Sequence, residues 1–279
     1  MTIALPVQSK LKAAFPVRNL KFAFDTSPRY WFDANPFYSH MLNGMSAIFP
    51  QGELYLIEIL RKVRTRIDNP QLQADISAFI GQEAMHSKEH TAFNRYADQH
   101  GIDIGTLEFY MVQLYTLMKK GLPDMQHMAI GCAIEHCTAT LGAQLLRSAA
   151  WNERMRGPLR ELWLWHAIEE NEHKAVYFDA YIAAGGGYLN RVVWMVIAGS
   201  GLVGLAAHHC LRLLYADQQL SALLNIKALA RIFHPQTGLF NLRVLGEFID
   251  YYRPSFHPND HDTKALESMW RERMQLKTA

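Results

Sequence analysis

The segment FIGQEAMHSKEH at residues 79–90 and the segment WLWHAIEENEH at residues 163–173 decide the fold class of this chain. Each contains a glutamate followed three positions later by a histidine, Glu83 with His86 and Glu170 with His173. Residues three or four apart share one face of an α-helix, so each pair can converge on one point if its segment is helical. The apolar and aromatic residues before both pairs indicate that these helices are buried.

The rest of the chain continues this helical pattern. Good helix formers fill long segments, and breakers such as Asn69-Pro70 and the glycines at 185–187 separate them. No segment alternates apolar and polar residues over a useful length, so no β-sheet is expected. The sequence therefore predicts an all-α fold, with helices at about 40–67, 71–100, 104–119, 124–150, 156–183, 189–215 and 219–232, and a weaker one near 262–276.

Composition indicates a single globular domain. The chain has 279 residues, of which 49% are hydrophobic, and a formal net charge of +2. Because the charges of both signs are interspersed, we expect no nucleic-acid partner. Residues 1–38 are rich in proline and aromatic residues, so we expect an N-terminal arm followed by one helical domain over 39–279. Cys132, Cys137 and Cys210 lie in apolar runs without a CxxC pair, and no signal peptide is visible, which favours the cytoplasm.

The two Glu-x-x-His pairs are part of a twofold pattern. Glu53 precedes Glu83 by 30 positions, and Glu135 precedes Glu170 by 35. Each half thus offers a glutamate on one helix and a Glu-x-x-His on the next, the donor set that di-iron and di-manganese helical bundles use. Buried, unpaired carboxylates are costly, and metal ions would remove that cost. The pattern predicts two metal ions, most favourably iron, with manganese or zinc as alternatives.

Helical geometry adds further candidates. At 100° per residue His166 shares the face of Glu170 and His173, so we predict seven metal ligands in all. His90 shares the face of Glu83 and His86 and is either an additional ligand or a residue that orients one, and Glu169 could orient one too. Small residues surround Glu135 on its helix (Gly131, Cys132, Thr138, Ala139 and Gly142). They either leave room for a substrate or allow tight packing, and the Thr138 hydroxyl could take part in catalysis.

The segments FPQGE (49–53), FIGQEAMHSKEH (79–90), IEHCTA (134–139) and 163–181 resemble the bacterial family of predicted metal-dependent hydrolases within the ferritin-like superfamily. More distantly, the ligand pattern is similar to that of the non-haem di-iron aryl-amine N-oxygenases, which have an added histidine corresponding to His166. The resemblance implies a ferritin-like four-helix bundle with additional C-terminal helices. It also implies a di-iron centre that activates dioxygen with electrons from a separate donor protein.

Three functions fit this pattern. Our first hypothesis is an oxidoreductase, a di-iron oxygenase or desaturase acting on a small or acyl-chain substrate. The first alternative is a metal-dependent hydrolase that uses a metal-bound hydroxide, with His90 or Glu169 moving protons. The second alternative is a non-enzymatic metal-binding bundle. We also expect the chain to form a homodimer.

The segment at 192–207 is unusually apolar for a soluble protein. No charged residue occurs between Arg191 and Arg212, and 192–207 is nearly all apolar. Its glycines suit close helix packing, which favours a helix buried in the bundle or in a dimer interface. The alternative is membrane insertion or peripheral membrane contact through 192–207.

Overall fold

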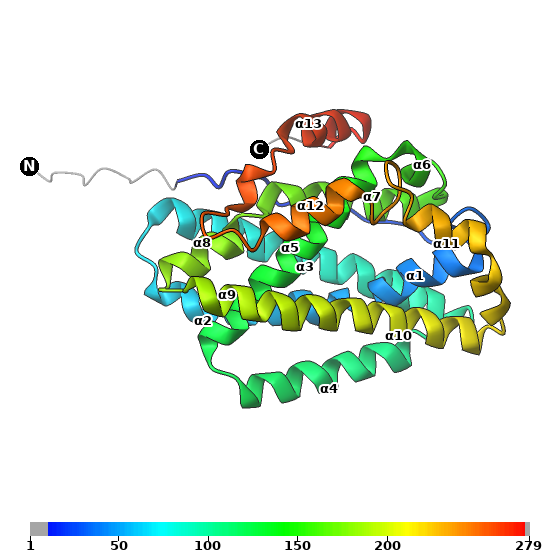
Figure 1. Cartoon of the computed structure of the whole chain (residues 1–279), viewed down its shortest axis with the longest axis horizontal. Coiled ribbons are helices and arrows are strands. Elements are labelled where there is room, and N and C mark those ends of the chain that lie inside the picture. Colours follow the sequence, from blue (N-terminus) through cyan, green and yellow to red (C-terminus); the bar gives the residue numbers. More distant parts are fainter. Residues whose placement is uncertain (1–10, 277–279) are drawn as a thin grey trace, which may run out of the picture.

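The computed structural model describes residues 11–276, and these form an all-α protein without any strand (Figure 1). A short π-helix at Met195–Gly199 joins two of the helices into one rod. The α-helices are α1 (Pro36–Ser46), α2 (Phe49–Val63), α3 (Pro70–Gln99), α4 (Gly105–Gly121), α5 (Asp124–Arg147), α6 (Ala149–Asn152), α7 (Gly157–His173), α8 (Val176–Ala183), α9 (Tyr188–Trp194), α10 (Ser200–Ala216), α11 (Ile226–Ile232), α12 (Leu242–Asp250) and α13 (Lys264–Arg273).

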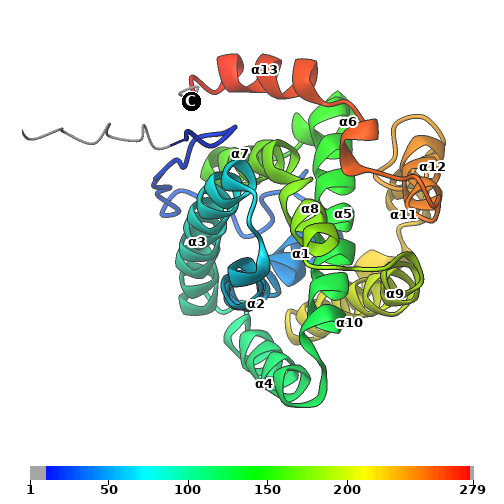
Figure 2. The same ribbon diagram turned by 90° about the vertical axis from the view of Figure 1, so that its left-hand side faces the viewer.

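Four helices form the central bundle. Helix α2 packs on α3, α3 on α7, α7 on α5 and α5 on α2, so the four close a ring. The short helix α8 follows α7 and packs on α3 and α5. Helices α4, α9 with α10, and α13 lie on the outside of this bundle (Figure 2).

Two apolar clusters make up the core, one toward each end of the bundle. On α3, Ile76 and Phe79 belong to one cluster, whereas Phe93 and Ala97 belong to the other. The polar pair Glu83 and His86 lies between them in the sequence of the same helix. The polar site is therefore enclosed by apolar packing at both ends, which excludes bulk water from it.

Most predicted helices are present, and the differences have local causes. The helix predicted at 40–67 is two helices, because Pro50 lacks an amide donor and suits the first turn of a helix, where it lies in α2. The helix predicted at 156–183 is likewise divided into α7 and α8. Helix α1 begins at Pro36, inside the predicted arm, with the Asn35 side chain capping it. Helix α12 was not predicted.

The arm is ordered over the part that the structure describes. Residues 11–35 lie against α3 and α7, with the ring of Phe22 5.6 Å from that of Trp165 and the ring of Phe24 5.5 Å from that of Phe93. The side chain of Gln82 donates a hydrogen bond to the carbonyl of Pro16. The arm thus covers the side of the bundle where α3 and α7 meet.

The apolar segment at 192–207 lies on the surface of the chain. It belongs to the rod formed by α9, the π-helix and α10, which crosses the face of the molecule seen in Figure 1. Tyr188–Ala216 is long and apolar enough to cross a membrane, and only 11% of its most apolar window is buried within the chain. The interior of the bundle is therefore excluded for this helix, whereas its burial in a dimer interface stays a prediction.

Candidate metal centre

Each of the seven predicted ligands projects from one of the four bundle helices into the enclosed space between them. Helix α2 provides Glu53, α5 provides Glu135, α3 provides two residues and α7 provides three. Every one of these side chains is at most 5% exposed, although carboxylates usually lie on the surface of a protein. The structure thus brings together the full set Glu53, Glu83, His86, Glu135, His166, Glu170 and His173.

Glu170 lies at the centre of the set. Its Oε1 is 2.9 Å from His166 Nε2, 3.6 Å from His86 Nδ1 and 3.6 Å from His173 Nε2. Glu83 connects the same rings, since its Oε1 is 3.4 Å from both His86 Nδ1 and His173 Nε2. Oxygen and nitrogen atoms at these separations leave room for small cations between them.

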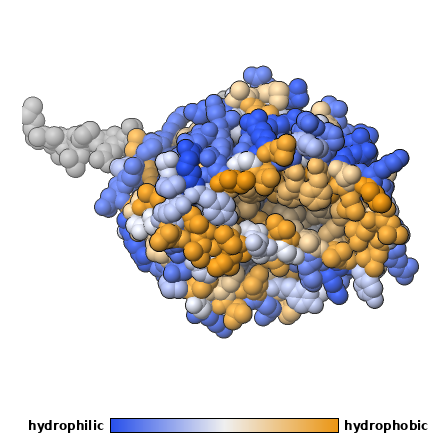
Figure 3. Space-filling view, in the orientation of Figure 1, coloured by the Kyte–Doolittle hydropathy of each residue, from blue (hydrophilic) through white to orange (hydrophobic). Residues whose placement is uncertain are grey.

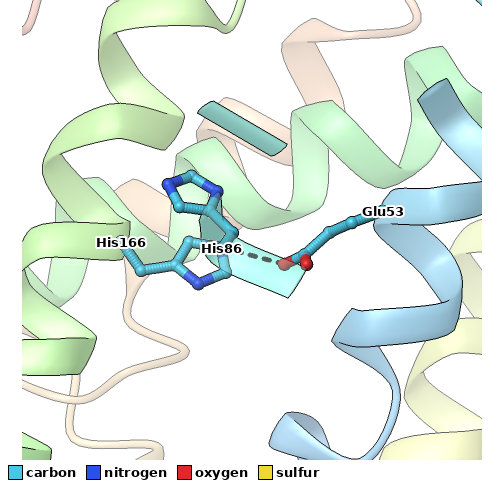
Figure 4. A group of neighbouring side chains, drawn as sticks. All are labelled: Glu53, His86 and His166. Atoms are coloured by element: carbon cyan, nitrogen blue, oxygen red, sulfur yellow. Dashed lines mark ion pairs between the residues drawn. The ribbon is translucent and has the colours of Figure 1, made fainter. Parts of the chain in front are cut away.

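The donor atoms fall into groups that match ion sites. Glu53, His86 and His166 can each offer an atom within 4.8 Å of the others (Figure 4), and so can Glu83, Glu135 and His173. These two triads share no residue. A third triad, Glu83, His86 and Glu170, takes one member from each and adds the central glutamate. The geometry therefore offers two adjacent positions with a carboxylate between them.

Unsatisfied polar atoms test whether a metal fits. Both carboxylate oxygens of Glu53, one oxygen each of Glu83, Glu135 and Glu170, Nδ1 of His86 and Nε2 of His173 are buried without a hydrogen-bond partner among the described residues. Buried polar atoms without partners are rare and costly. Here they converge on one place, and mixed carboxylate and imidazole donors suit divalent transition metals. The residues fit metal ions.

The other ring nitrogen of each of the three histidines contacts a neighbouring side chain. Nε2 of His86 is 3.0 Å from Glu169, Nδ1 of His173 is 2.9 Å from Gln82, and Nδ1 of His166 is 2.7 Å from His90. If a metal binds the inner nitrogen, the outer nitrogen carries the proton and donates a hydrogen bond to that partner. Such contacts set the tautomer and the orientation of a ligating histidine.

A second layer of contacts holds these partners. Arg18 from the arm donates to Glu169 at 2.8 Å and to Glu172 at 2.7 Å. Glu172 also accepts from Gln82 at 3.0 Å and from Arg271 of α13 at 2.8 Å. Glu172 thus points away from the ligands and accepts hydrogen bonds from these three side chains instead. Segments far apart in the sequence thus support the orientation of His86 and His173.

In the absence of a cation, several site residues have raised pKa values. Burial raises the pKa of Glu135 to about 8, and burial together with the charge of Glu83 raises the pKa of Glu53 well above its usual range. Burial opposes the charged form of His86, but its contacts with Glu169 and Glu83 outweigh this and raise its pKa to about 10. Without metal the site therefore holds protons that bound cations would replace.

The two predicted catalytic residues make different kinds of contact. His90 is an outer residue that contacts His166 and, at 2.8 Å through Nδ1, the hydroxyl of Ser46. This contact agrees with the orienting role, one of the three roles predicted for His90. The Thr138 hydroxyl donates to the carbonyls of Ile134 and Glu135 on its own helix.

The small residues beside Glu135 serve packing at two positions. A Cβ on Gly131 would lie 2.2 Å from the ring of Tyr177, and one on Gly142 would lie 3.3 Å from the backbone of Ala167. Neighbouring helices therefore occupy the space that these glycines leave. The supporting residues Gln82, Arg18 and Arg271 were missed, because they act through other side chains and carry no spacing signal.

The fold and the site define an all-α protein with a buried carboxylate and histidine centre fit for metal ions. The model of a family described as predicted metal-dependent hydrolase matches residues 16–262, a range that includes all seven site residues. The chain therefore belongs to this family of predicted metal-dependent hydrolases, as its sequence segments suggested. Comparison with the curated proteins and with the solved structures gave no match.

Proposed function

We propose that the chain is a metal-dependent hydrolase that holds two divalent cations in its central bundle. The observation that carries this proposal is the pair of triads without a shared residue, joined by one glutamate. The family match supports the hydrolytic class. A bundle whose helices contribute Glu, Glu-x-x-His, Glu and Glu-x-x-His is also typical of ferritin-like dinuclear proteins, so we extend the proposal to that superfamily.

The site residues fall into two groups, one for each cation. Glu53, His86 and His166 would hold one cation, and Glu83, Glu135 and His173 the other. Glu170 would lie between the two. When bound, the cations supply Lewis acidity, which lowers the pKa of a water molecule and polarises a carbonyl or phosphoryl oxygen.

The other residues control orientation and access. With metal bound, Glu169, Gln82 and His90 would each accept a hydrogen bond from the outer ring nitrogen of one histidine and so keep that nitrogen directed away from the centre. His90 and Glu169 also provide positions to which a proton can move. The aromatic rings of Phe49 and Trp165, 4.7 Å from His166 and 4.8 Å from His86, exclude water from the back of the site.

Hydrolysis without oxygen is the direct test. The metal-free protein is loaded separately with Mn²⁺, Zn²⁺ and Fe²⁺, and turnover of a panel of ester, amide and phosphoester substrates is measured in the absence of oxygen. We expect turnover that depends on metal and is lost in Glu170→Ala, but kept in Glu161→Ala, which changes an exposed glutamate of the same helix. Turnover that is equal in both variants, or none with any metal, contradicts the proposal.

A second candidate is the di-iron oxygenase or desaturase of our first hypothesis. The specific observation in its favour is His166, a third nitrogen donor that makes the site more suited to iron. The more distant resemblance to aryl-amine N-oxygenases agrees with it, and the electrons would come from a separate donor protein. Oxygen uptake by the iron-loaded, chemically reduced protein tests this candidate. Its absence, with hydrolysis present, leaves the hydrolase.

A further inference from the structure

We propose that the face formed by α9–α12 binds the surface of an anionic lipid bilayer. Residues 180–250 contain 17 of the 24 exposed large apolar side chains within residues 11–276. In a monomeric soluble protein, large apolar patches of this kind mark an interaction site. Figure 3 shows apolar residues gathered on the face that carries α9 and α10.

The apolar side chains form a continuous stripe along the rod of α9, the π-helix and α10. Leu189 is 74% exposed, Val203 62% and Tyr215 67%, and they span most of the rod. At 100° per residue these positions lie on one side of the helix, with Arg212 as the one exposed charge. Helices α11 and α12 extend the patch, since Ile226 is 77% and Leu242 69% exposed.

The charges of this region point to an anionic partner. Residues 180–250 contain five basic residues, at 191, 212, 227, 231 and 243, and three acidic residues, at 217, 247 and 250. The three acids are already engaged, Asp217 by Arg29, Tyr30 and His40, Glu247 by Arg147 and Arg243, and Asp250 by Arg253 and His261. Arg191 is buried and Arg231 pairs with Asp33, whereas Arg212 and Lys227 are exposed and form no ion pair among the described residues. Apolar side chains interspersed with exposed lysine and arginine are the composition of helices that lie in the interface of an anionic membrane.

The rod lies on a membrane rather than through it, because its inner side is held by the fold. Arg191 is 2% exposed, donates to the carbonyls of Tyr251 and Arg253, and has its guanidinium 4.6 Å from the centre of the Tyr251 ring. Near the other end, a Cβ on Gly44 of α1 would lie 2.9 Å from the Cβ of His209. Crossing a bilayer would require all these contacts to break.

A second copy of the chain is a poorer occupant for the same reason. Two copies joined symmetrically through this face would bring basic residues such as Arg212, Lys227 and Arg243 into one interface. The acids of this face, Asp217, Glu247 and Asp250, are already engaged by side chains of the same chain and so are not free to oppose the basic residues of a second copy. Like charges brought together in an interface disfavour association.

Vesicle binding tests the proposal, and it is independent of the metal chemistry because the readout is partition and not turnover. The full-length, metal-loaded protein is mixed with vesicles of phosphatidylcholine alone or with added phosphatidylserine, at low and high salt, and the bound fraction is measured by flotation. The first test variant is Arg212→Gln/Lys227→Gln/Arg243→Gln. Its control is Arg61→Gln/Arg95→Gln/Arg156→Gln, three exposed arginines elsewhere.

We expect binding to the anionic vesicles that weakens with salt. The test variant should lose about a hundredfold in partition coefficient, since each basic residue near an anionic surface contributes roughly a fivefold factor. The control triple should keep it. Leu189→Gln/Leu211→Gln should also lose binding, whereas Leu11→Gln/Leu54→Gln, with similar exposure, should not.

Three outcomes would overturn the proposal. The first is equal partition of the wild type onto neutral and anionic vesicles, or onto neither. The second is equal binding by the test and control variants. The third is a stable dimer in sedimentation equilibrium that Leu189→Gln/Leu211→Gln converts to a monomer, which would assign the face to a second copy. Circular dichroism of all variants checks that each one is folded.

Discussion

At the scale of single residues, Glu170 has a position that no other site residue shares. Its Oε1 lies within 3.6 Å of one nitrogen of each of the three histidines. A contact with all three places it between the two proposed ions. Its loss should therefore affect both positions and not one.

We predict that Glu170→Ala lowers the metal content by at least one ion per chain and weakens affinity more than about a hundredfold, since even changes beyond the ligands can cost ten- to hundredfold. Elemental analysis after dialysis measures the content. The matched variant Glu161→Ala lies on the exposed side of α7 and should keep the wild-type content. Unchanged content in Glu170→Ala would remove Glu170 from the site.

His209 should make stability depend on pH. Burial lowers its pKa, and its Nε2 has no hydrogen-bond partner among the described residues. Below about pH 6.5 the unfolded chain then binds a proton that the folded chain does not, so stability falls as the pH falls, by at most ~1.4 kcal/mol per pH unit.

Urea unfolding of the metal-free protein from pH 7.5 to 5.5 measures this slope. We expect a shallower slope for His209→Gln than for the wild type. His208→Gln, a neighbour with an exposed ring, is the control and should keep the wild-type slope. Identical slopes in all three proteins would exclude His209 as a source of the pH dependence.

At the scale of elements, the arm is a part of the metal centre although it contributes no ligand. Arg18 reaches Glu169, which holds His86, and Glu172, which holds Gln82 and through it His173. We predict that Arg18→Gln weakens metal affinity about tenfold or more. Competition with a chromogenic chelator measures it. Lys21→Gln, an exposed change in the same arm, should have no effect, and equal affinities would exclude the arm from this role.

The contact between α5 and α8 depends on Gly131. Tyr177 is fully buried against it, so the ring cannot move away from an added methyl group. We predict that Gly131→Ala destabilises the protein by about 1–3 kcal/mol, as overpacking usually does. Gly204→Ala, in α10 with open space around it, should be neutral or stabilising by up to ~1 kcal/mol. Denaturant midpoints compare the two, and a neutral Gly131→Ala would contradict the role of packing.

The sequence could predict the ligands because their signal is local. Glu83 with His86 and Glu170 with His173 share a face through helical spacing alone, and His166 follows from the same count. Glu53 lies in the first turns of α2, just after Pro50, so its face could not be assigned from periodicity, and its place came from the twofold spacing and the family resemblance. An apolar run such as 192–207 has the same pattern whether protein or another medium covers it. The exposure of this run could therefore be determined only from the tertiary structure.

At the scale of the whole molecule, the metal centre should be a major source of stability. The four bundle helices meet at a group of buried carboxylates, and a ligand that binds only the folded state stabilises it by mass action. A metal concentration of 100 times the Kd adds about 2.7 kcal/mol per site. For a domain of this size that corresponds to a rise in Tm of roughly 5–10 °C.

Calorimetry of the chelator-treated and reloaded protein measures this rise. Glu170→Ala should show a much smaller one, whereas Glu161→Ala should match the wild type. A Tm that does not change with metal would mean that the centre forms without stabilising the fold.

The contacts of Glu172 also bear on how the protein is made in the cell. Glu172 accepts hydrogen bonds from Arg18 and from Arg271, which is 99 residues further along the chain. All seven ligands leave the ribosome before Arg271 does. A nascent chain therefore has every donor atom before it has the Arg271 guanidinium, which helps to hold Glu172 in place. We therefore expect metal to be held more weakly until α13 has been synthesised and has docked, and a chain cut short before α13 to release its metal more readily.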